Sequence, residues 1–187
     1  MDRIRQVLFL ASALALCWLL MQIVHEAGHV LGAWLTGARV ERVVLHPLAI
    51  SRTDVSRNLH PGVVAWLGPV VGALAPCVAW QLMPRRWPSA VAIAGFFAGF
   101  CLLANGLYLS VGVAEGIGDC GDLMRHGTPA RVLVAIGVAA SLAGLLIWHR
   151  LGSPLALFTA KRLPSWSAAL GCALALAGLA AAEIALS

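Results

Sequence analysis

An HExxH pattern follows directly on an uninterrupted apolar stretch near the start of the chain. Residues 7–24 hold nothing more polar than a serine and a glutamine, and HEAGH occupies 25–29. On a helix the fourth residue onward returns to the same face, so His25 and His29 can reach one metal ion with Glu26 near its water. Such side chains are costly near hydrocarbon, which favours a site facing the protein interior. The alternative is an interfacial helix end, where they meet headgroups and water.

Composition indicates a membrane protein. Of the 187 residues, 60% are hydrophobic and 11% are charged, and the mean hydropathy is +0.88. A membrane-spanning helix needs roughly 20 apolar residues. The sequence therefore predicts an all-α, multi-pass integral membrane protein with about five transmembrane helices. They cover about 4–24 continuing through the motif toward 36, 62–83, 89–114, 130–149 and 165–186. The first is too long for a signal peptide and runs into HEAGH without a small-x-small cleavage site, so we expect it to be retained.

The net charge of +5 arises from residues between the predicted spans. The 13 lysines and arginines cluster in these gaps rather than on one face, so the lipid bilayer is their expected partner and nucleic acid is not. Seven of them fall on one side of the membrane and six on the other, so the count of basic residues does not determine the orientation of the protein in the membrane. The pattern specifies no oligomeric state.

The longest segment between spans follows Thr36-Gly37, where the first helix is expected to end. Residues 40–45 are β-branched and partly alternating, which predicts a short strand or hairpin between the first and second spans. The second span contains Gly68-Pro69-Val70-Val71-Gly72. This GxxxG spacing lets helices approach closely, and helix packing alone accounts for it.

Two histidines leave a catalytic zinc site incomplete, because such sites use three protein ligands and one water. We favour Asp119 as the third ligand, since it lies in a glycine-rich turn at the expected start of a short helix. Asp122 and Glu115 are competing ligands. The alternative for Asp119 itself is a helix N-cap, a position that suits aspartate without any metal.

Asn105 and the cysteines are secondary candidates. Asn105 lies deep in the third span, where it can bond a neighbouring helix, position a substrate, or orient a metal ligand. Cys120 lies in the polar turn beside Asp119, so a role as metal ligand is an alternative there. The other four cysteines fall in apolar runs and are expected to be small buried hydrophobes: Cys17, Cys77, Cys101 and Cys172.

Taken together, HEAGH at the end of one span, GPVVG in the next and an aspartate in a glycine-rich turn resemble the core of the intramembrane site-2 zinc metalloprotease family. The resemblance covers roughly residues 10–130. It implies that Zn²⁺ is bound by three residues, that Glu26 is the catalytic base and that Asn105 positions substrate. The implied zinc ligands are His25, His29 and Asp119.

The resemblance also implies an organisation and a function. Residues 1–130 would form a membrane-embedded metalloprotease-like core, and 131–187 would add two transmembrane helices. The expected activity is hydrolysis of peptide bonds in or near transmembrane segments of membrane-protein substrates, which pair with the hairpin. The alternatives are a catalytically inactive zinc-binding or regulatory protein, and a structural membrane protein. The arginines of residues 39–57 and the family together favour a cell-membrane protein whose active site faces the cytoplasm.

Overall fold

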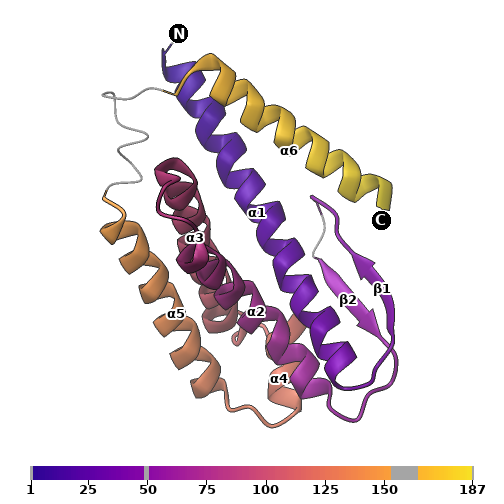
Figure 1. Cartoon of the computed structure of the whole chain (residues 1–187). Helices are drawn as coiled ribbons and strands as arrows, with labels where there is room; N and C mark the ends of the chain where they lie inside the picture. The colour runs from indigo at the N-terminus through magenta and orange to yellow at the C-terminus, as the bar shows by residue number, and fades with distance from the viewer. Residues whose placement is uncertain (1, 49–50, 153–163, 187) are drawn as a thin grey trace.

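The computed structural model describes residues 2–48, 51–152 and 164–186. Five described helices are long and apolar enough to cross a membrane, as expected of a multi-pass integral membrane protein (Figure 1). The remaining described elements are an antiparallel hairpin between the first two helices and one short helix, which confirms the expected fold class. The elements are α1 (Asp2–Leu35), β1 (Val40–Val44), β2 (Arg52–Val55), α2 (Pro61–Leu82), α3 (Pro88–Gly112), α4 (Gly118–Arg125), α5 (Ala130–Arg150) and α6 (Trp166–Leu186).

Helix α1 ends in a glycine-based cap, as the sequence predicts. Gly37 has φ +73°, a left-handed conformation that only glycine adopts without strain. The N–H of Ala38 donates to the carbonyl of Ala33 at 2.9 Å, and the N–H of Gly37 donates to that of Trp34 at 3.3 Å, which is the Schellman pattern. The reversal lets the hairpin fold back beside the C-terminal half of α1 (Figure 1).

Helices α3 and α5 pack through glycines. A Cβ added to Gly106 would stand 2.5 Å from the Gly137 carbonyl and from Ser141 Oγ, and a Cβ on Gly144 would stand 2.6 Å from the Gly99 carbonyl. Close backbone approach of this kind is the usual way for helices to associate in lipid, where apolar burial gives no advantage over lipid contact. Small residues therefore hold α5 against α3.

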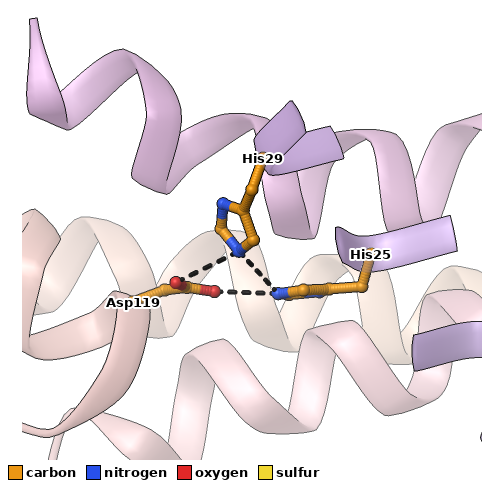
Figure 2. A group of neighbouring side chains, drawn as sticks. All are labelled: His25, His29 and Asp119. Atoms are coloured by element: carbon orange, nitrogen blue, oxygen red, sulfur yellow. Dashed lines mark hydrogen bonds and ion pairs between the residues drawn. The ribbon is translucent and has the colours of Figure 1, made fainter. Parts of the chain in front are cut away.

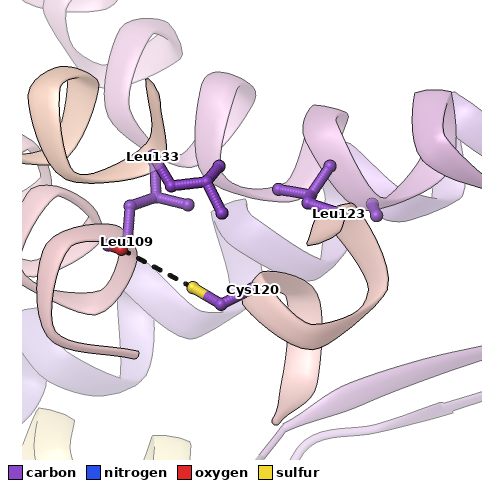
Figure 3. Packing of buried hydrophobic residues seen from close by; sticks show 5 residues of the cluster. Leu109, Cys120, Leu123 and Leu133 are labelled. Atoms are coloured by element: carbon purple, nitrogen blue, oxygen red, sulfur yellow. Dashed lines mark hydrogen bonds between the residues drawn. The ribbon is translucent and has the colours of Figure 1, made fainter. Parts of the chain in front are cut away.

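The short helix α4 is anchored by a small apolar cluster. Cys120, Leu123 and Leu133 are fully buried and pack with Leu109 and Ala65, so α4 is held by residues of α2, α3 and α5 (Figure 3). The apolar face of α4 thus faces the bundle, which fixes the helix on which Asp119 lies. Burial of the cysteines is as expected for Cys101, whereas Cys17, Cys77 and Cys172 are only half-buried because each also borders the outside of the bundle.

We expect Gly106→Val to weaken the bundle. The added side chain overlaps the α5 backbone, and overpacking of this kind lowers the free energy of unfolding by about 1–3 kcal/mol. Thermal unfolding in detergent measures the effect. Gly171→Val is the matched control on α6, since a Cβ there meets no described atom within 4 Å. Equal melting temperatures for the two variants would contradict the packing analysis.

Candidate metal centre

His25 and His29 of the C-terminal half of α1 converge with Asp119 of α4 (Figure 2). His25 Nε2 lies 2.9 Å from Asp119 Oδ2, His29 Nε2 lies 3.3 Å from Asp119 Oδ1, and the two Nε2 atoms are 3.1 Å apart. A tetrahedral zinc ion with ligand bonds of 2.0–2.2 Å would separate neighbouring ligand atoms by about 3.4 Å. The three side chains are therefore spaced close to what one ion requires.

Hydrogen bonds behind the imidazoles fix which nitrogen of each faces this cluster. His29 Nδ1 lies 2.8 Å from the Val64 carbonyl, which can only accept, so this nitrogen carries the proton. The amide nitrogen of Asn105 donates to the Cys101 carbonyl at 2.9 Å, which turns its oxygen toward His25 Nδ1 at 2.7 Å. His25 Nδ1 therefore also donates. Both Nε2 atoms then present lone pairs, as metal-ligating histidines do.

The donor set fits a cation. With both Nδ1 atoms protonated, two Nε2 lone pairs and a carboxylate point at one another, and acceptors this close need a positive charge between them. Burial by itself raises the pKa of the Asp119 carboxyl, but when the facing imidazoles carry a proton in place of a metal ion, their hydrogen bonds and positive charge outweigh burial and lower the pKa to about 2. The carboxyl is thus ionised at neutral pH, as a zinc ligand must be.

The glycines of the second span make room for this arrangement. A Cβ on Gly68 would overlap the His29 imidazole and stand 2.9 Å from His25 Nε2. A Cβ on Gly72, one turn later, would stand 2.9 Å from Asn105 Oδ1. The interpretation of GPVVG as helix packing alone is therefore incomplete, because its two glycines border the imidazoles and the amide that orients one of them.

Helix α4 presents Asp119 from its first turn. Its N-cap is Ile117, which makes no capping bond through its side chain, so the interpretation of Asp119 as an N-cap is wrong. Instead the carboxylate contacts the histidines, and the Asp119 N–H donates to Tyr108 Oη at 3.0 Å. Gly116 and Gly118 adopt φ values of +63° and +57°, left-handed conformations that are strained for residues with a side chain. The two glycines allow the chain to bend into α4.

The competing ligands lie apart from the cluster. Asp122 forms an ion pair with Arg125, and the Glu115 side chain is exposed, although both line the same cavity. Cys120 Sγ contacts the carbonyls of Tyr108 and Leu109 inside the apolar cluster (Figure 3). Burial, reinforced by the Asp119 charge, raises the pKa of its thiol to about 11, whereas metal ligation needs the thiolate.

Glu26 is held by the hairpin. Its side chain is 2% exposed, and Thr53 of β2 donates a hydrogen bond from Oγ1 to Glu26 Oε2 at 2.7 Å. Thr53 has no distinctive sequence pattern around it, so reasoning from the sequence missed this contact. It also missed Tyr108, whose position one helical turn after Asn105 was the available signal.

The three candidate ligands, Glu26, Thr53 and Tyr108 line a cavity of about 810 Å³ between α1, β2, α3 and α4. All of β2, residues 52–55, lies along one wall. Within the described part of the chain β2 pairs only with β1, so its second edge has no strand partner. The cavity therefore joins the metal-ligand cluster, Glu26 and an unpaired strand edge in one space.

Comparison with known proteins gives one family match. A family described as Peptidase M50B-like matches residues 6–113, which is more than half of the chain. Comparisons with curated proteins and with solved structures give no match. The matched region contains both histidines, Glu26 and Asn105 but ends before Asp119. The evidence that Asp119 lies beside the histidines therefore comes from the structure and not from the family match.

We expect Gly68→Ala to abolish stoichiometric zinc binding, because the new methyl group occupies the space of the His29 imidazole. Zinc per protein is measured by elemental analysis of the detergent-purified protein. Gly62→Ala is the matched control on the same helix, since its Cβ would make only an ordinary contact at 3.5 Å with His126. Full zinc occupancy in Gly68→Ala would contradict this description of the site.

Proposed function

The chain belongs to the Peptidase M50B-like family, and we propose that it is a membrane-embedded zinc metalloprotease. Its substrates are membrane proteins, cleaved in or near a transmembrane segment. The observation that carries the proposal is the convergence of two imidazoles from α1 and one carboxylate from α4, all within reach of one ion. His25, His29 and Asp119 are the proposed ligands and Glu26 is the proposed base.

When bound, zinc supplies Lewis-acid chemistry, since it acidifies a coordinated water and polarises a peptide carbonyl. The chain's own residues provide the rest. Glu26 takes the proton of the attacking water and returns it to the leaving amine. Thr53 holds Oε2 of this carboxylate, which leaves Oε1 to face the water. Asn105 keeps the His25 ring oriented through Nδ1, so we assign it this orienting role besides its proposed role in positioning substrate.

The substrate must reach this cavity in an extended form, because a helix hides its carbonyls in its own hydrogen bonds. We propose that the unwound segment pairs with the free edge of β2, which lines the cavity. Strand addition satisfies backbone groups that would otherwise be unpaired near hydrocarbon. This assigns the hairpin the same role that the family resemblance implies.

Orientation and organisation complete the proposal. Arg39, Arg42, Arg52 and Arg57 lie in the loop that leaves the ligand-bearing end of α1, which favours a cytoplasmic location for this end in a cell membrane. We propose residues 1–130 as the core. Helices α5 and α6 are then supporting helices, packed against α3 and α1 respectively.

We expect Glu26→Gln to keep zinc and to lose cleavage by a factor of about 10²–10⁴, the usual contribution of a general base. The readouts are zinc content and mass-spectrometric detection of cleavage in a panel of transmembrane peptides in liposomes. Glu41→Gln, an exposed change on β1, is the control and should match wild type. Undiminished cleavage by Glu26→Gln rejects the mechanism. Zinc bound by a wild type that cleaves nothing favours a non-hydrolytic zinc protein.

We expect Thr53→Val to lower kcat about tenfold without changing zinc content, because it removes one hydrogen bond to the base. Thr53→Ser retains the hydroxyl and should restore the rate, which separates the hydrogen bond from strand packing. Steady-state cleavage of a peptide from the same panel measures both variants. An unchanged rate in Thr53→Val would show that Glu26 needs no support from the hairpin.

A further inference from the structure

We propose that Tyr108 is a catalytic residue that donates a hydrogen bond to the carbonyl oxygen of the substrate as that oxygen becomes negatively charged. The inference rests on the proposed protease function and adds a residue to it. Two observations carry it: the hydroxyl is fixed beside a proposed metal ligand, and its proton has no acceptor among the described residues.

Tyr108 lies on α3 within the wall of the catalytic cavity. Its ring meets the His25 imidazole edge to face, with the centroids 5.8 Å apart and the planes at 83°. Asn105, which orients His25, lies one helical turn earlier on α3. The tyrosine therefore extends the same helix face that already supports the metal-ligand cluster.

The hydroxyl is held in place by the loop before α4. Oη accepts a hydrogen bond from the Asp119 N–H at 3.0 Å. The hydroxyl is thus bonded directly to the backbone of the proposed third ligand. A Cβ on Gly118 would overlap Oη, and Gly118 has φ +57°, a conformation that favours glycine. The glycine-rich turn is thus shaped around the tyrosine hydroxyl as well as around Asp119.

The hydroxyl keeps a free donor. A tyrosine hydroxyl has one donor and two acceptor sites, and the Asp119 N–H uses an acceptor site. Two other polar side chains near the cluster are already engaged: Thr53 donates to Glu26, and the Asn105 oxygen accepts from His25 while its nitrogen donates to Cys101. The Tyr108 proton is therefore available to a ligand in the cavity.

The chemistry requires such a donor. As water oxygen bonds to the carbonyl carbon, the carbonyl π electrons move onto oxygen and create negative charge there. The Tyr108 O–H donates a hydrogen bond to this oxygen and keeps its proton, while Glu26 carries the water proton to the amine as the C–N bond breaks. Donors placed in advance where charge develops contribute strongly, and loss of one lowers kcat about 10²–10³-fold.

The test compares wild type with Tyr108→Phe in the zinc-loaded, detergent-purified full chain. We expect kcat for a transmembrane peptide cleaved by wild type to fall about 10²–10³-fold, with KM and zinc content unchanged. Ser110→Ala is the control, because it removes another α3 hydroxyl, one that donates to the Gly106 carbonyl. That variant should retain the wild-type rate.

Inhibitor binding gives a readout independent of turnover. A phosphinic peptide carries a tetrahedral anionic group, whereas a thiol peptide of the same sequence binds zinc without an oxyanion. We expect Tyr108→Phe to weaken phosphinic-peptide binding about 10–100-fold and to leave thiol-peptide binding unchanged, since only the former needs the donor.

Three results would overturn the assignment: unchanged phosphinic binding, equal weakening of both inhibitors, or loss of zinc from Tyr108→Phe. The last two would make Tyr108 a support for Asp119 only. A wild type that holds zinc but binds neither inhibitor and cleaves no peptide contradicts the protease function itself. That outcome is distinct from failure of the Tyr108 variant alone.

Discussion

Polar side chains placed near hydrocarbon must find their partners inside the protein, and this constraint arranges the bundle around α1. His29 obtains its partner from the Val64 carbonyl of α2, and His25 obtains its partner from Asn105 of α3. For both bonds to form, α2 and α3 must approach α1 closely at the same position along the α1 axis. Gly68 and Gly72 permit that approach because any side chain there would displace the groups concerned.

Much of this fold is predictable from the sequence, because spans in lipid follow from apolar length and each predicted span is found with nearly the same ends. The hairpin and the end of α1 were also predictable, from β-branched residues and from Gly37. The two histidines were identified by residue type and spacing, and Asp119 was favoured over Asp122 and Glu115 because of its glycine-rich turn. Their alignment depends on tertiary contacts, so the orienting role of Asn105 became specific only when its bond to His25 was seen.

Other features could not be predicted because they join residues with no local pattern between them. Thr53 and Glu26 are 27 residues apart in the sequence. Their hydrogen bond depends on the register of the hairpin and on the packing of β2 against α1. The half-buried cysteines show a related limit. Apolar surroundings in sequence do not distinguish a lipid-facing position from a core position, since both favour the same residue types.

The division of the cluster between α1 and α4 has a consequence for biosynthesis. His25 and Asp119 are separated by 94 positions, and α2 and α3 lie between them in the chain. The two histidines are therefore synthesised well before the third candidate ligand. For the protease that we propose, this order of synthesis would delay hydrolytic competence until α4 has packed against the bundle.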